Sequence, residues 1–194
     1  SIANSIMMAD ELSTYRGAIH VFSGPTHSRS VAAAARRRGT PCLDLDICIG
    51  GASHDLTSAT LIASLIGAIR ERRITAAVIG QPCSSFSVLR DEGGECPRLR
   101  SPLQPWGDED APDEWHEYLD LHNKLVKVSA LLAWELFKVG GAFLIENPAW
   151  SGASGVPWRW GAKSHHGSLW LLDVIQELQH LTAAELITFP QCAL

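Results

Sequence analysis

Cysteine is scarce in this chain, and its arrangement excludes two classes of small domain. The five cysteines, at positions 42, 48, 83, 96 and 192, contain no CxxC pair and are odd in number. Disulfide frameworks need even numbers and zinc ribbons need paired cysteines, so neither is expected. The same usage predicts an intracellular, reducing compartment, either the nucleus or the cytoplasm.

Long apolar runs and an excess of positive charge are also missing. No stretch reaches the roughly 18 apolar residues that a bilayer span needs, so we expect no membrane contact. The formal net charge is -5, whereas tight phosphate binders are usually basic, so the chain has no broad electrostatic footprint for nucleic acid. Residues 1–17 show no secretory pattern and are expected to be an N-terminal extension or a cloning remnant.

Apolar runs that alternate with helical patterns predict a single α/β domain over residues 18–194. Strands that alternate with helices form a parallel sheet with helices on both faces, as in Rossmann-like doubly wound folds. Strands are expected at 18–22, 41–47, 74–79, 142–145 and 186–189, and helices at 31–38, 58–69, 115–139 and 168–178.

Two turns at the carboxyl ends of predicted strands carry side chains suited to chemistry. Cys83 follows the strand at 74–79 in a Pro-Cys turn, where a thiolate could act as a nucleophile, although a buried structural cysteine fits the same position. Glu146 follows the strand at 142–145 in a turn restricted by Pro148. If the two strands are neighbours, both side chains lie at one edge of the sheet.

Two other segments suggest a ligand site but are weaker signals. The first predicted strand ends in a turn with a single glycine, Gly24, which does not match the G-x-G-x-x-G fingerprint. Asp46, with Asp44 as the second choice, ends the second strand, where doubly wound folds hold a ribose hydroxyl pair, although a solvated strand-end aspartate is an alternative. Residues 88–114 are rich in proline, glycine and acidic residues, and a loop of this length is usually functional or disordered.

The order of these motifs resembles that of the cytosine-5 DNA methyltransferases. Pro82-Cys83-Ser84-Ser85-Phe86-Ser87 resembles their Pro-Cys-Gln-x-Phe-Ser segment, and Glu146-Asn147-Pro148 resembles their Glu-Asn-Val. Phe22-Ser23-Gly24-Pro25 resembles the family's Phe-x-Gly-x-Gly start. Asp46 and Asp55 fall where the family has its ribose-binding and adenine-contacting acids.

The chain also resembles, over nearly its whole length, a diverged group of methyltransferase-like domains found in viral, protist and retroelement polyproteins. The added matches are Arg100-Ser101, Pro105-Trp106-Gly107 and a terminal Gln-Cys-Ala at 191–193. The resemblance implies a class I methyltransferase sheet that is truncated at its C-terminus.

The resemblance implies methyl transfer from S-adenosylmethionine to C5 of cytosine in DNA, without a metal. Cys83 would add to C6 of the base, and Glu146 would contact N3 and the exocyclic amine. The implied cofactor-binding residues are Phe22, Ser23, Gly24, Asp46, Asp55 and Pro82. The implied contacts to DNA, or to RNA, are Ser85, Ser87, Arg90, Arg98 and Arg100.

Several departures from the family leave other functions open. The glycine-rich turn is reduced to Gly24-Pro25, Ser84 replaces a glutamine, and there is no Gln-x-Arg-x-Arg strand. Only 46 residues follow Pro148, too few for a target recognition domain, so DNA binding is expected to need further domains or subunits. The alternatives are a catalytically inactive methyltransferase-fold module in a larger polyprotein, and a methyltransferase acting on RNA or a small molecule with a structural Cys83.

Overall fold

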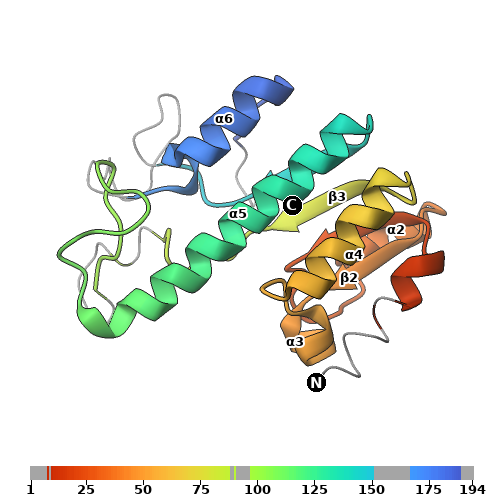
Figure 1. Cartoon of the computed structure of the whole chain (residues 1–194), viewed down its shortest axis with the longest axis horizontal. Coiled ribbons are helices and arrows are strands. Elements are labelled where there is room, and N and C mark those ends of the chain that lie inside the picture. Colours follow the sequence, from red (N-terminus) through yellow and green to blue (C-terminus); the bar gives the residue numbers. More distant parts are fainter. Residues whose placement is uncertain (1–7, 9, 88–89, 91–96, 151–166, 189–194) are drawn as a thin grey trace. The chain divides into compact units, whose positions relative to one another are not determined.

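The structure of the chain, a computed structural model, describes residues 8, 10–87, 90, 97–150 and 167–188 (Figure 1). By its internal contacts the chain divides into two compact units. The first contains residues 1–82 and 124–146, and the second contains residues 83–123 and 147–194. Each unit is described by itself.

The first unit is a parallel α/β layer structure. Its strands are β1 (Gly17–Val21), β2 (Cys42–Leu45), β3 (Ile74–Gly80) and β4 (Ala142–Glu146). Its helices are α2 (Val31–Arg37), α3 (Ile47–Gly50), the 3-10 helix η1 (Gly51–His54), α4 (Ala59–Arg70) and residues 124–138 of α5 (His116–Lys138). The first four strands expected from the sequence are therefore confirmed, within a few residues at each end.

The four strands form one sheet in the order β2-β1-β3-β4, and every pair in it is parallel. The chain runs outward from β1 to β2 and then returns past β1 to reach β3. This reversal is the mark of a doubly wound sheet, and the arrangement is compatible with a Rossmann-like fold.

The two faces of the sheet have different neighbours, because alternate residues of a strand point to opposite sides. Ile19 and Val21 of β1 are fully buried in the main core, together with residues of α4 and α5. His20, between them, belongs to the opposite face, where Arg36 of α2 reaches its cross-strand partner Asp44. Helices thus cover both faces, as the sequence predicts.

The N-terminal segment contributes to this core. Residues 10–14 are helical, and Met8 and Leu12 are buried among the core residues of the sheet. The guanidinium of Arg73 donates to the Leu12 carbonyl oxygen. Tyr15 donates its hydroxyl to the Ala18 carbonyl oxygen at 2.5 Å, and burial raises the pKa of this phenol to about 12. The described part of the segment expected to be an extension, residues 8 and 10–17, is therefore integral to the first unit.

The second unit is less regular. It contains the 3-10 helix η3 (Asp113–Trp115), residues 116–123 of α5, the 3-10 helix η4 (Leu169–Leu171) and α6 (Asp173–Thr182). A small apolar cluster is formed by Leu99, Ala111 and Leu119, with Trp115 and Tyr118 packed against it.

The prediction for the C-terminal segment is partly wrong. The single helix expected at 168–178 is broken into η4 and α6, and α6 continues to Thr182. No strand forms at 186–188: α6 ends with Ala183 in the left-handed conformation, and residues 184–188 have no regular structure. Position 189 and the Gln-Cys-Ala at 191–193 lie outside the described residues. Within the described part of the chain, no helix has the length and apolarity to cross a bilayer.

Candidate active site

The strand order defines where a ligand site is expected in the first unit. The carboxyl ends of β1 and β3, at Val21 and Ile79, are register partners at the point where the winding of the sheet reverses. Open α/β sheets bind ligands in the crevice beyond such a reversal point. The turns that leave β1, β2 and β3 therefore form the candidate site.

The turn after β1 has an unusual backbone. Phe22 has a φ of 56° and Gly24 a φ of 66°, both in the left-handed region. A non-glycine residue there costs about 1 to 3 kcal/mol and persists only where its surroundings hold it. The Phe22 N–H donates to the Leu45 carbonyl oxygen at 2.8 Å, and a Cβ on Gly80 would lie 3.1 Å from the Phe22 oxygen. Glycine at position 80 thus lets this turn approach the end of β3 closely.

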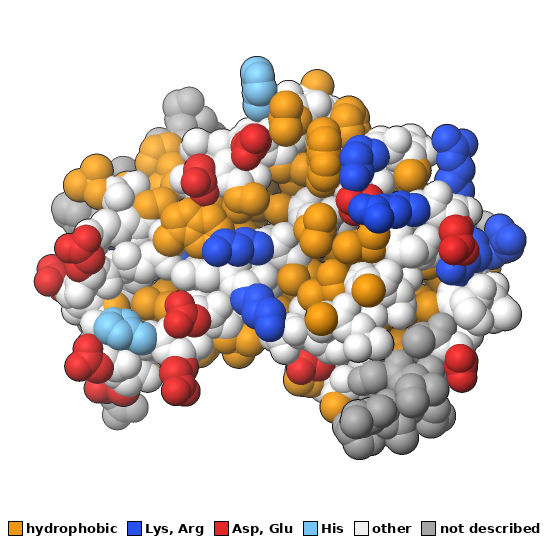
Figure 2. All heavy atoms as spheres, in the orientation of Figure 1, with side chains coloured by type: hydrophobic (Ala, Val, Ile, Leu, Met, Phe, Trp, Pro, Cys, Tyr) orange, Lys and Arg blue, Asp and Glu red, His pale blue; other side chains and the backbone are white. Residues whose placement is uncertain are grey.

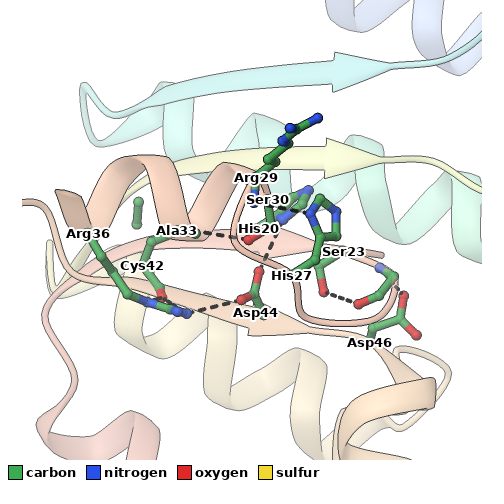
Figure 3. Close-up of polar contacts among 12 residues, drawn as sticks. His20, Ser23, His27, Arg29, Ser30, Ala33, Arg36, Cys42, Asp44 and Asp46 are labelled. Atoms are coloured by element: carbon green, nitrogen blue, oxygen red, sulfur yellow. Dashed lines mark hydrogen bonds and ion pairs between the residues drawn. The ribbon is translucent and has the colours of Figure 1, made fainter. Parts of the chain in front are cut away.

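Asp46 ties the end of β2 to the turn after β1 (Figure 3). Its Oδ2 accepts the Gly24 N–H at 2.9 Å, and its Oδ1 accepts the Cys48 N–H at 2.8 Å as the N-cap of α3. The Cys48 thiol is also hydrogen-bonded to this carboxylate, which raises the pKa of the thiol. Because a carboxylate has about four acceptor positions, capacity for a ligand hydroxyl remains. Hydrogen bonds thus fix the Asp46 carboxylate while leaving it able to accept a further one.

Two further residues of the predicted cofactor set lie in turns of the same unit. The Ser23 hydroxyl donates to the Gly24 carbonyl oxygen at 3.2 Å. The Oδ1 of Asp55 accepts both the N–H and the hydroxyl of Thr57 at 2.8 Å, in the turn before α4. The structure thus brings Gly24 and Asp46 into direct contact and uses Asp55 to shape a neighbouring turn.

The end of β3 is fixed from two sides. Gln81 is buried, and its Oε1 accepts the Ser129 hydroxyl of α5 at 2.6 Å. Pro82 follows it as the last first-unit residue of this turn. Glu146, the half-buried last residue of β4, is the register partner of Gly80. The expectation that β3 and β4 are neighbouring strands is confirmed. Their pairing puts the candidate acid beside the start of the Pro-Cys turn.

A buried polar cluster beneath α2 was not predicted from the sequence (Figure 3). Asp44 lies between His20, whose Nδ1 is 3.2 Å from its Oδ1, and Arg36, whose Nη2 is 3.0 Å from its Oδ2. The same Arg36 nitrogen donates to the Cys42 carbonyl oxygen at 2.8 Å. The cluster satisfies a buried carboxylate and fixes β2 two residues before Asp46. Its only sequence signal was a histidine and an aspartate in strands that otherwise read as apolar.

Cys83 is the first residue of the second unit, whereas Glu146 belongs to the first unit. The two members of the candidate catalytic pair are therefore described separately. Its side chain is exposed, and its carbonyl oxygen accepts the Phe86 N–H at 2.8 Å in a tight turn. Cys42 has the contrasting environment: burial, and next the charge of Asp44, raise the pKa of its thiol. Cys42 is therefore the structural cysteine of the two, and Cys83 is accessible.

The turn that follows Cys83 is braced by Arg90. Its Nε donates to the Ser84 carbonyl oxygen at 2.6 Å, and its guanidinium lies over the rings of Trp115 and Tyr118, at 4.8 and 5.5 Å from their centroids. The Tyr118 hydroxyl is hydrogen-bonded to the Ser84 hydroxyl. These contacts restrict the backbone next to the candidate nucleophile.

Arg100 braces the same turn from within. Only 2% of this arginine is exposed, and its guanidinium lies 4.1 Å from the centroid of the Phe86 ring. Its Nε donates to the Ser85 hydroxyl at 3.2 Å and its Nη1 to the Pro105 carbonyl oxygen at 2.7 Å. The Ser85 hydroxyl is also 3.2 Å from His122 Nδ1. Burial lowers the pKa of Arg100 to about 10, a sign that the charge is held at a cost in solvation.

The residues predicted to contact nucleic acid are thus used inside the second unit. Ser85 and Arg100 are buried, Ser87 is half-buried, and Arg98 pairs with Asp108 at 3.0 Å. Sequence reasoning found these residues but not their bracing role. The sequence does not reveal which residues contact Arg100, because Phe86 and Pro105 come close to it only in the folded chain.

Among the described residues, no group of three or more His, Cys, Asp or Glu side chains is arranged to hold a metal ion. Comparison of the chain with models of protein families, with curated proteins and with solved structures found no match. Function must therefore be argued from the site itself.

Proposed function

We propose that this chain is a class I methyltransferase domain that transfers a methyl group from S-adenosylmethionine to C5 of cytosine in DNA. The observation that carries the proposal is the arrangement at the carboxyl edge of the sheet. Asp46 is held against the turn after β1 by the Gly24 N–H, and Glu146 lies beside Gly80 at the start of the Pro-Cys turn. This order of turns is what the motif resemblance requires.

The residues present fit an adenosyl cofactor. Asp46 retains acceptor capacity for a ribose hydroxyl, and a Cβ placed on Gly24 would have nothing within 4 Å, so the space beside this turn is open. Phe22, Ser23 and Gly24 shape one wall of the site, and Pro82 shapes the end of β3. Asp55 is proposed to receive the adenine amine. When bound, the cofactor supplies an electrophilic methyl group.

The chain's own residues supply the activation of the base. The Cys83 thiolate forms a bond to C6 of a cytosine turned out of its helix, which makes C5 nucleophilic. The Glu146 carboxyl group hydrogen-bonds N3 and the exocyclic amine as electron density builds up in the ring. After C5 takes the methyl group, loss of the C5 proton to solvent and of the Cys83 sulfur from C6 restores the aromatic ring and the free thiolate.

The arginines and the overall charge of the chain bear on how the domain would bind DNA. Arg98 and Arg100 are engaged within the second unit, and the chain is acidic overall, so phosphate contacts are proposed to come from further domains or subunits. The alternative is a methyltransferase acting on RNA or a small molecule. The engagement of the arginines favours the small molecule within this alternative, because a small molecule needs no phosphate contacts.

Calorimetric titration with S-adenosylmethionine and with S-adenosylhomocysteine tests the proposed function. We expect both to bind saturably, with the heat lost when the site is filled by the other ligand. Absence of binding at millimolar concentrations of both ligands would contradict methyl transfer and favour the inactive module.

A further inference from the structure

The acidic charge of the chain is divided unevenly between its two units. The first unit contains eleven Lys and Arg residues against eight Asp and Glu residues, whereas the second contains five against thirteen. The net charge is therefore +3 for the first unit and -8 for the second. An excess of positive charge in one part of a chain makes that part a candidate for contact with phosphate groups.

Most of this positive charge lies at the amino edge of the sheet, opposite the candidate active site. All four strands are parallel, so their amino ends lie at one edge and their carboxyl ends at the other. Seven arginines occur in the segments that lead into β1, β2 and β3, at position 16, in 36–38 and in 70–73. Figure 2 shows Lys and Arg side chains gathered over the part of the first unit where α4 ends.

Three of these seven arginines have no partner within the described part of the chain. The other four donate to carboxylates or carbonyl oxygens of the first unit: Arg36, Arg37, Arg70 and Arg73. Arg16, Arg38 and Arg72 are exposed, and their side chains form no hydrogen bond or ion pair with described residues. We call these three the amino-edge arginines.

The amino-edge arginines precede three strands that are neighbours in the sheet. Gly17 donates its N–H to the Arg73 carbonyl oxygen at 2.9 Å, so the chain at Arg16 runs beside the chain at Arg72. Arg38 precedes β2, which pairs with β1 on the other side. Because neighbouring strands are about 4.8 Å apart, the three segments span about 10 Å, the rise of about three nucleotides along one strand of DNA.

Local structure does not account for arginine at positions 38 and 72. A cation near the end of a helix favours its dipole, but Arg36 and Arg37 already occupy the last turn of α2, and Arg70 that of α4. Arg72 has a φ of 56°, in the left-handed region that glycine adopts without cost after a helix. The backbone therefore favours a different residue at position 72, and the exposed charge calls for another explanation.

The chemistry of this edge fits phosphate groups on a nucleic acid. All three free cations are arginines, whose planar guanidinium binds a phosphate through two parallel hydrogen bonds. No large apolar side chain is exposed at 16, 36–41 or 70–75, all of which the structure describes. Binding to a membrane surface usually combines basic with apolar side chains, so a lipid surface fits less well.

We propose that the amino-edge arginines bind the phosphate backbone of DNA without regard to its sequence. Because β3 is seven residues long, they lie about 20 Å from the carboxyl edge of the sheet. A base in the DNA segment held there cannot reach Glu146, so these arginines anchor DNA outside the proposed active site, and contacts around the reacting base still come from further domains or subunits. The choice of DNA rests on the proposed function, whereas the phosphate contacts need neither cofactor nor catalysis.

Fluorescence anisotropy of a labelled DNA duplex tests the proposal with the full chain and without cofactor. Three phosphate contacts predict a slope of about -2.7 for the logarithm of the binding constant against the logarithm of salt concentration, or about 40-fold weaker binding at 200 mM than at 50 mM salt. The combined variant Arg16→Gln, Arg38→Gln and Arg72→Gln should bind about tenfold or more weakly at 50 mM salt and lose most of this slope.

A matched pair of single variants locates the contact. Arg72→Gln and the control Arg29→Gln each remove one exposed arginine from the first unit, the second from the segment between β1 and α2 at the carboxyl edge. We expect Arg72→Gln to reduce the slope by about 0.9 and Arg29→Gln to leave it unchanged. Urea unfolding of each variant shows whether it is folded.

Several results would overturn the proposal. These are no binding of the duplex, equal binding by the combined variant and the wild type, equal weakening by Arg29→Gln and Arg72→Gln, and binding of an RNA duplex of the same sequence without binding of DNA. Binding of phosphatidylserine vesicles in place of the duplex would assign the arginines to a lipid surface. Calorimetry with S-adenosylmethionine keeps the two proposals apart, because DNA binding without cofactor binding contradicts the proposed function alone.

Discussion

Gly80 at the end of β3 and Glu146 at the end of β4 are register partners in a parallel sheet. The Pro-Cys turn therefore starts directly beside the candidate acid, and both lie at the edge where Asp46 is tied to the turn after β1. The relationship requires two strands that are more than sixty residues apart in the chain to be adjacent in the sheet. It is the firmest structural support for treating this edge as an active site.

Asp46→Asn is predicted to weaken cofactor binding. The amide nitrogen that replaces one carboxylate oxygen cannot accept the N–H of Gly24 or of Cys48, and it also removes an acceptor for the ribose. We expect the affinity for S-adenosylmethionine to fall about tenfold or more, and the free energy of unfolding to fall by about 1 kcal/mol. Calorimetry and urea unfolding measure the two effects. Asp10→Asn, at an exposed position of the first unit, is the control, and an unchanged affinity of Asp46→Asn would remove this residue from the site.

Arg100→Lys is predicted to loosen the Cys83 turn without affecting the cofactor. Lysine cannot reproduce the planar pair of hydrogen bonds to Ser85 and Pro105 or the stacking on Phe86. We expect a loss of about 1 to 3 kcal/mol in the free energy of unfolding, and a slower reaction at Cys83, with cofactor affinity within a few fold of the wild type.

The control for Arg100 is Arg98→Lys. The Arg98 side chain is 43% exposed in its pair with Asp108, so its replacement is expected to cost about 0 to 1 kcal/mol. Equal effects of the two lysine substitutions on stability and on the reaction at Cys83 would show that Arg100 does not position the turn.

Glu135→Gln is predicted to make the free energy of unfolding less dependent on pH in the acidic range. The hydrogen bond from Arg70, and next the contact with Lys138, lower the pKa of the buried Glu135 carboxyl from 4.5 to about 2. A carboxyl whose pKa is lower in the folded state stabilises the fold above its unfolded pKa and loses this effect as the pH falls toward its folded pKa. At neutral pH we expect the variant to be less stable by about 1 to 2 kcal/mol.

The difference between the wild type and Glu135→Gln should stay constant down to about pH 4.5 and then shrink as the pH approaches about 2. Urea unfolding across this range measures it, with Glu177→Gln, at an exposed position of α6, as the control. A difference that is the same at neutral pH and at about pH 3 would contradict the assigned role of the Arg70–Glu135 pair.

Glu146→Gln is predicted to abolish methyl transfer while leaving cofactor binding within a few fold. The amide keeps the shape of the side chain at the end of β4 but removes the acid that stabilises the activated base. A filter assay with labelled cofactor measures methyl transfer to DNA, and calorimetry measures cofactor binding. Loss of both activities would mean that Glu146 has a structural role.

Periodicity predicted the sheet well and the site only in part. The apolar run that became β3 is recognisable because this strand lies inside the sheet and needs an apolar sequence for burial. The run that became β4 is equally apolar although β4 is an edge strand and its Leu144 is exposed. The run at 186–189 has the same composition, yet residues 186–188 form no strand, since a strand also needs a partner ladder that composition does not reveal. Leu186 and Ile187 are exposed instead.

Contacts between distant segments account for most of what was missed. The position of Asp46 after a strand predicts a ligand role, but its hydrogen bond to Gly24 depends on how closely the turn after β1 approaches β2. Arg100 lies in a proline-rich segment that reads as solvated, and its burial against Phe86 could not be inferred from neighbouring residues. The sequence therefore identifies Asp46 and Arg100 as candidate residues, whereas their contacts are known only from the folded structure.

The most direct test of the account is covalent trapping at Cys83. The chain, together with any partner needed for DNA binding, is mixed with S-adenosylmethionine and a duplex containing 5-fluoro-2′-deoxycytidine, whose fluorine blocks release of the adduct. The account predicts a stable protein–DNA species by mass spectrometry that maps to Cys83 and is absent for Cys83→Ser. Cofactor binding and methyl transfer to DNA without any adduct, or with an adduct that persists in Cys83→Ser, would contradict it.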